Sequence, residues 1–132
     1  MVNWRQVVTN LCELANNNII ELNDGQRASL KAVAARIQKN GIIIADEVGM
    51  GKTRIATTIT KAVIDAGGRV AILVPPGLGF QWGAELRKSH VEGVPEILRS
   101  LLQYLKAWEN STNPSPWSKQ NILLISHAFC NW

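Results

Sequence analysis

The chain has 132 residues, of which 46% are hydrophobic and 18% are charged, and this composition is typical of a globular protein rather than a disordered one. The length leaves room for one domain with a buried core, although it is short for a doubly wound α/β enzyme. The formal net charge of +4 is mildly basic and by itself is only weak evidence for a nucleic-acid partner.

The cysteines and the apolar runs exclude several other classes. Cys12 and Cys130 lie far apart, with no C-x-x-C spacing and no clustered histidines, so neither a disulfide framework nor a zinc site is indicated. We expect both to be buried thiols in a reducing cytoplasm. The first eighteen residues contain Arg5 and Glu13 and make no signal-peptide core. No apolar run approaches the ~18 residues of a membrane span, so a cytoplasmic protein without a membrane segment is predicted.

Two helices are predicted before residue 40. The first is amphipathic, ends at Asn16 to Asn18, and carries the apolar positions Trp4, Val8, Leu11 and Ala15. We assign residues 1–21 to an N-terminal helical extension. Asn23 and Asp24 are natural N-caps for the second helix, whose apolar face consists of Leu30, Val33, Ala34 and Ile37.

The stretch GIIIADEVGMGKT begins at Gly41 and has the order of a phosphate-binding loop. Ile42 to Ala45 lacks polar alternation, which is typical of a parallel strand buried on both faces. Gly49 and Gly51 can take positive φ, so the backbone N–H groups can turn inward and form a nest for phosphate oxygens.

Lys52 and Thr53 complete this loop at the start of a helix. In such loops the lysine reaches the β and γ phosphates, the threonine hydroxyl coordinates Mg²⁺, and the helix N-terminus favours the anion. Asp46 stands where the general pattern has its first glycine. An apolar strand that ends in Asp46 and Glu47 also resembles a Walker B site, but Lys52 follows too closely, so both carboxylates are assigned to shaping the loop. The predicted ligands are ATP and Mg²⁺, with catalytic Lys52 and Thr53 and with nucleotide contacts from Asp46, Glu47, Val48, Gly49, Met50, Gly51, Lys52, Thr53 and Arg54.

The remaining elements alternate between helices and strands, which is typical of α/β proteins. A helix with the buried stripe Ile55, Ile59, Ala62 and Val63 is followed by a stop at Gly67-Gly68. A buried strand at 69–74 ends at Pro75-Pro76-Gly77, and a helix follows at 79–88. Pro95 can open a further helix with the apolar positions Leu98, Leu101, Leu102, Leu105 and Trp108, which we expect to be core. A surface loop at 110–120 then leads to a third apolar strand at 121–126.

Four blocks of this sequence resemble the Swi/Snf-type ATPases of helicase superfamily two. These blocks are LNDGQ from Leu22, ADEVGMGKT from Ala45, PPGLGFQWGAEL from Pro75 and ILLISHAF from Ile122. The resemblance implies a P-loop NTPase fold of the RecA-like, three-layer type with a parallel sheet. Residues 22–132 would form only the N-terminal part of its first lobe, so the fold is expected to be incomplete.

The same resemblance implies further site residues. Gln26 would read the adenine edge, although its sequence context alone favours an ordinary solvated helix position. Strand ends with Pro75, Pro76, Ser126 and His127 would face the backbone of double-stranded DNA. Trp82 is more typical of a core anchor than of a DNA contact, and for His127 a capping or buried position is an equal alternative.

The predicted function is therefore the ATP-binding part of an ATP-dependent DNA translocase. Hydrolysis needs a carboxylate on Mg²⁺ and a positive charge on the transition state. No Asp-Glu-x-His block occurs, and the arginine fingers of a second lobe are missing, so we expect these 132 residues alone to be inactive. Two alternatives remain: a non-catalytic nucleotide- or DNA-binding module, and a small P-loop kinase, for which no acidic Mg²⁺ ligand or arginine lid is seen.

Overall fold

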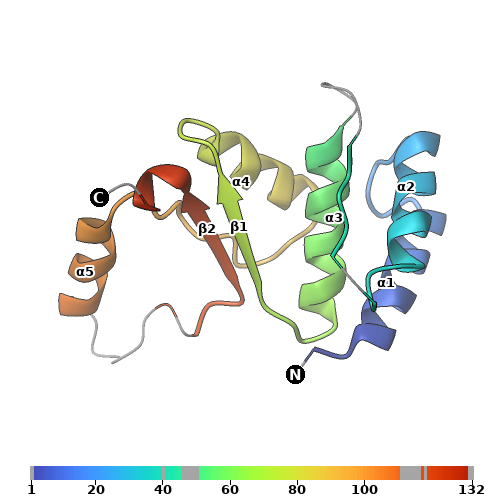
Figure 1. Cartoon of the computed structure of the whole chain (residues 1–132), viewed down its shortest axis with the longest axis horizontal. Helices are drawn as coiled ribbons and strands as arrows, with labels where there is room; N and C mark the ends of the chain where they lie inside the picture. Colours follow the sequence, from blue (N-terminus) through green and yellow to red (C-terminus); the bar gives the residue numbers. More distant parts are fainter. Residues whose placement is uncertain (1, 40, 46–50, 111–116, 118, 131–132) are drawn as a thin grey trace.

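The fold is of the predicted α/β class, with two parallel strands set among five helices in the described part of the chain (Figure 1). The computed structural model describes residues 2–39, 41–45, 51–110, 117 and 119–130, without the side chain of residue 130. The elements are α1 (Trp4–Asn16), α2 (Asp24–Ala34), α3 (Lys52–Asp65), β1 (Val70–Val74), α4 (Gly79–Lys88), α5 (Leu101–Glu109), β2 (Ile122–Ser126) and a 3₁₀ turn, η1 (His127–Cys130).

The first three helices pack side by side and enclose the larger of the two apolar cores that the described residues form (Figure 1). Leu11 of α1, Leu30 of α2 and Ile55 of α3 are fully or almost fully buried in it. The helix predicted at the N-terminus is confirmed, but its buried stripe is Val7, Leu11, Leu14 and Ala15. Trp4 is 43% exposed, so it contributes less to the core than predicted.

Strands β1 and β2 pair in parallel, from Val70 opposite Ile122 to Val74 opposite Ser126. Leu98 adds a single bridge on the other side of β2: its N–H donates to Leu124 O at 2.8 Å, and its carbonyl accepts from Ser126 N at 2.9 Å. The two strands predicted around these positions are therefore confirmed, and their carboxyl ends meet at one edge of the sheet.

Only one face of this sheet is well covered by the described residues. Ile72 and Leu124 turn toward α4 and the second core, which contains Leu86, Val91 and Ile122. On the opposite face Leu73 is 56% exposed. The strand predicted at 69–74 is confirmed, but the expectation that it is buried holds for one face only.

The predicted strand from Ile42 to Ala45 is also wrong. The segment is extended but belongs to no ladder, and it runs along α3 in Figure 1. Ile42 and Ile44 pack against the helical core while Ile43 is 93% exposed. A strand needs a hydrogen-bonded neighbour, and no described residue pairs with this segment. Three consecutive isoleucines gave the composition of a buried strand, but here alternate side chains point to solvent.

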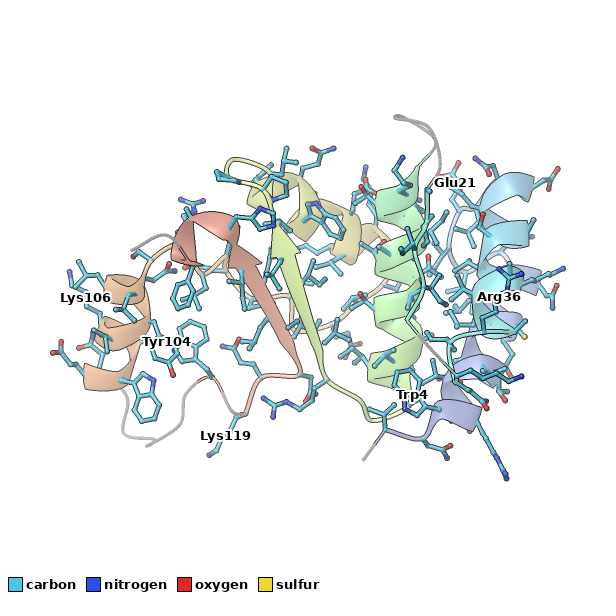
Figure 2. The ribbon with its side chains drawn as sticks, viewed as in Figure 1. Trp4, Glu21, Arg36, Tyr104, Lys106 and Lys119 are labelled. Carbon is cyan, nitrogen blue, oxygen red and sulfur yellow. The ribbon has the colours of Figure 1, made fainter. Side chains whose placement is uncertain are left out.

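Helix α5 begins at Leu101, six residues later than the predicted start at Pro95. Ser100 caps it by accepting from Gln103 N at 3.2 Å, while Leu98 is held in the bridge to β2. No residue of α5 is buried, and Leu102 is 61% exposed, so the expected core role of its leucines is wrong. Tyr104 lies on the side of α5 that faces the sheet (Figure 2) and stacks on Trp117, with ring centroids 5.8 Å apart.

Two smaller expectations can be compared with the structure. Cys12 is a free thiol that is half-buried rather than fully buried, and the side chain of Cys130 lies outside the described residues. No helix in the described part of the chain is both long enough and apolar enough to cross a membrane.

Candidate functional site

The N-terminus of α3 is built on Gly51, which has φ of 77° in the left-handed region. Glycine adopts this conformation at little cost because it has no Cβ. Gly51 gives no side-chain cap, and no acidic residue lies in the first turn of α3. The helix dipole and the backbone N–H groups at such an end favour an anionic ligand.

A capping box on α2 places Gln26 against this glycine. The side chain of Asn23 accepts from Gln26 N at 2.8 Å, and the side chain of Gln26 accepts from Asn23 N at 3.0 Å. The side-chain amide nitrogen of Gln26, Nε2, also donates to Gly51 O, over a long distance of 3.4 Å. A Cβ added at Gly51 would clash with that nitrogen, so a side chain at position 51 would displace the Gln26 amide from this contact.

An open cleft of about 710 Å³ lies between these groups and α4. In Figure 1 the start of α3 and the carboxyl ends of both strands lie at the same side of the molecule, at the top, and Figure 2 shows Glu21 beside the start of α3. The cleft is lined by Glu21, Asn23, Gln26, Gly51, Lys52, Thr53, Arg54, Gln81 and Glu85.

An ion pair closes the side of the cleft next to α4. Arg54 Nε lies 2.9 Å from Glu85 Oε2, and Arg54 Nη1 donates to Glu21 O at 3.0 Å. The other carboxylate oxygen of Glu85 accepts from Lys88 Nζ at 3.0 Å. The hydrogen bond from Arg54 lowers the pKa of Glu85; burial opposes this shift, and the hydrogen bond from Lys88 adds to it.

The predicted nucleotide residues are brought together only in part. Gln26, Gly51, Lys52, Thr53 and Arg54 line one cleft, whereas the predicted contacts from Asp46 to Met50 lie outside the described residues. Thr53 is half-buried at the helix start. The described residues contain no cluster of three or more His, Cys, Asp or Glu side chains that could hold a metal ion. Thr53, the predicted Mg²⁺ ligand, lines the cleft.

The residues predicted to face DNA lie at the carboxyl ends of the two strands. Pro75 and Pro76 are exposed after β1. Ser126 is 3% exposed, and its hydroxyl accepts from Ala128 N at 3.3 Å at the start of η1. His127 is exposed beside it. The exposed prolines and His127 thus share one surface, while the Ser126 side chain points into the structure.

Four residues of the cleft were not predicted: Glu21, Asn23, Gln81 and Glu85. A signal existed for three of them. The spacing Asn-x-x-Gln from Asn23 is that of a capping box, and Gln81 and Glu85 are four residues apart, which places them on one face of a helix. Nothing in the local sequence indicates that Glu21 approaches Arg54 through its backbone carbonyl. Trp82, expected to be a core anchor, is half-buried.

Comparison with protein families gives one match. Residues 19–125 match the family described as "Type III restriction enzyme, res subunit". The match begins before α2 and ends in β2, so it includes every residue that lines the cleft. No curated protein and no solved structure matches the sequence.

Proposed function

The chain belongs to the family of the type III restriction enzyme res subunit, and on that premise we propose that it is the ATP-binding part of an ATP-dependent DNA translocase. The proposal is carried by one observation. The cleft brings Gln26 of α2 together with Gly51, Lys52 and Thr53 at the uncapped start of α3. A glycine turn that leads into an amphipathic helix does not need a glutamine from another helix beside it.

Each group in the cleft has a role suited to Mg-ATP. Lys52 neutralises the β and γ phosphates, and the start of α3 supplies N–H groups and a positive dipole end. Thr53 offers its hydroxyl to Mg²⁺, which supplies charge neutralisation to the phosphates when bound. Gln26 has one amide end on Asn23 and the other on Gly51, and we propose that it reads the adenine edge. We also propose phosphate contacts for Asp46 to Met50, which lie outside the described residues.

The finer assignment to the Swi/Snf type is also a proposal. It rests on the four blocks LNDGQ, ADEVGMGKT, PPGLGFQWGAEL and ILLISHAF. In this reading residues 22–132 form a RecA-like lobe segment, and residues 1–21 precede it, although α1 shares its core with α2 and α3. Double-stranded DNA would contact the surface near Pro75, Pro76 and His127.

Hydrolysis needs more than this cleft provides. Of the two carboxylate side chains among the described residues that line the cleft, Glu85 is held by Arg54 and Lys88, and Glu21 is exposed. An arginine finger alone accounts for about 10³ to 10⁵ in rate in related chemistry. These 132 residues should therefore bind nucleotide without DNA-stimulated phosphate release, which a phosphate-release assay with duplex DNA measures.

The test of nucleotide binding is Lys52→Ala, titrated with a fluorescent ATP analogue and Mg²⁺. Affinity should fall by roughly tenfold or more, because a charge-assisted phosphate contact contributes about 1.5–3 kcal/mol. Lys106→Ala is the matched control, since Lys106 lies on α5, far from the cleft (Figure 2). Equal affinity for the wild type and Lys52→Ala would remove the phosphate-loop assignment.

A further inference from the structure

Arg54 lines the proposed nucleotide cleft, and its guanidinium is hydrogen-bonded to two other residues of the same cleft. Two of its N–H donors are used in hydrogen bonds within the described residues, one to Glu85 Oε2 at 2.9 Å and one to Glu21 O at 3.0 Å. Arginine has five such donors in a planar fork that matches phosphate oxygens. The side chain is therefore a phosphate-type donor that is held by a carboxylate across the cleft.

The pair is arranged so that it can open at low cost. The side chains of Arg54 and Glu85 are 19% and 18% exposed, so the ion pair is near solvent rather than deep in the core. Lys88 also holds Glu85, and its side chain is 63% exposed. When Arg54 leaves, the carboxylate keeps one cationic partner and access to water. Such an opening avoids the large penalty of an unpaired buried charge.

We propose that Glu85 competes with the nucleotide phosphates for Arg54. Arg54 is thus a conditional phosphate ligand, and Glu85 lowers the affinity of the cleft for nucleotide. The inference rests on the proposed function, because the competitor is the polyanion expected beside Lys52 and Thr53. The Arg54 fork exchanges one carboxylate for phosphate oxygens, and no covalent bond changes.

The exchange also changes what holds α4. Glu85 lies in the middle of α4, whereas Arg54 lies in the first turn of α3. With nucleotide absent, the ion pair ties the two helices together at the mouth of the cleft. With phosphate bound, this tie is released, while the buried contact between Thr57 and Ser89 remains one turn further in.

The experiment compares Mg-ATP affinity in Glu85→Gln, Arg54→Ala and the double variant, using the same fluorescent titration. Glu85→Gln should bind more tightly by roughly two- to fivefold, the factor that corresponds to the strength of an ion pair near solvent. When Arg54 is already alanine, adding Glu85→Gln should leave the Mg-ATP affinity unchanged, because there is no Arg54 side chain for Glu85 to release. Glu92→Gln is the control, since it removes one exposed carboxylate outside the cleft.

Each outcome decides the proposal. Tighter binding from Glu85→Gln only when Arg54 is present supports it. Tighter binding in both backgrounds would mean that Glu85 acts through its charge alone and would overturn it, as would unchanged or weaker binding in Glu85→Gln. If Lys52→Ala bound Mg-ATP as tightly as the wild type, the nucleotide site itself would be wrong. Failure of the proposed function is therefore distinguishable from failure of the Arg54–Glu85 inference.

A measurement on the unmodified chain covers the case in which a variant does not fold. The Nε–H resonance of Arg54 in a ¹H–¹⁵N spectrum is assigned on the wild-type chain, through its side-chain correlations to the Arg54 backbone. Saturating Mg-ATP should shift this resonance away from its carboxylate-bonded position, whereas adenosine, which has no phosphate, should leave it in place. A resonance that stays unmoved at saturating Mg-ATP would overturn the exchange of partners.

Discussion

The hydroxyl groups of Thr57 and Ser89 lie 2.6 Å apart, and both residues are fully buried. Thr57 belongs to α3, and Ser89 directly follows α4. The Thr57 hydroxyl also contacts Arg54 O at 3.1 Å. This contact fixes the distance between the two helices one turn beneath the Arg54–Glu85 pair, so the walls of the cleft have a common anchor.

The first prediction concerns this hydroxyl pair. Thr57→Val should lower the free energy of unfolding by about 1–3 kcal/mol, because it leaves the buried Ser89 hydroxyl without its partner. Ser89→Ala should cost less, since Thr57 can still donate to Arg54 O. Adding Ser89→Ala to Thr57→Val should recover part of the loss. Urea unfolding of the three variants measures these differences, and equal costs for the two single variants would contradict the arrangement.

The second prediction concerns Gly51. Gly51→Ala places an L side chain at φ of 77°, which costs about 1–2 kcal/mol, and it also clashes with Gln26 Nε2. Gly67→Ala is a matched control, because Gly67 has φ of 75° and no atom near its added Cβ. Thermal unfolding should show the larger loss for Gly51→Ala.

A double variant separates the clash from the backbone strain. Gln26→Ala alone should lower the stability because it removes the capping box. After this loss is subtracted, the double variant Gly51→Ala with Gln26→Ala should lose about as much stability as Gly67→Ala. If the double variant is no better than the sum of its two changes, the contact between Gly51 and Gln26 does not limit this position.

The third prediction is a pH dependence. In the folded chain the hydrogen bond from Arg54 lowers the pKa of Glu85 below 4.5, so the ionised form is favoured by folding. The resulting stability is present above about pH 4.5 and is lost as the pH falls through the folded-state pKa. Urea unfolding from neutral to acid pH should therefore show a smaller loss for Glu85→Gln than for the wild type. Glu92→Gln should lose stability as the wild type does.

The fourth prediction concerns DNA. If the surface near Pro75 and His127 meets duplex DNA, binding should be weak, independent of sequence, and lowered by salt. Each phosphate contact contributes roughly 0.9 to the slope of log affinity against log salt concentration. Fluorescence anisotropy with two duplexes of different sequence measures this. Binding that does not change with salt, or no binding at low salt, would count against the proposed surface.

The helices were largely predictable from local sequence, because their signals are local. Asn23 is a strong N-cap, Gly67-Gly68 stops α3, and the predicted helix at 79–88 has the bounds of α4. Leu98 was misassigned to a helix because apolar spacing cannot show that a residue is held by β2.

The errors in the sheet have a different cause. Whether Ile42 to Ala45 forms a strand depends on a neighbour in space, and sequence composition does not identify one. The same limit applies to β1, where Leu73 has the composition of a buried position and is 56% exposed. In the cleft, Lys52 and Thr53 could be read from a motif, while the Arg54–Glu85 pair depends on the packing of α3 against α4.

The pairing of β1 with β2 has a consequence for how the chain reaches this fold. Val70 of β1 pairs with Ile122 of β2, and the chain between these two residues contains α4 and α5. By contrast, α1, α2 and α3 are successive in the chain and share one core. Contacts that are close in sequence form quickly, and distant pairings must first close a long loop. The helical half should therefore fold early and the sheet late. Helix α4 is bonded directly to α3 through Thr57–Ser89 and Arg54–Glu85, so both walls of the cleft, and with them nucleotide binding, should form before the strands pair.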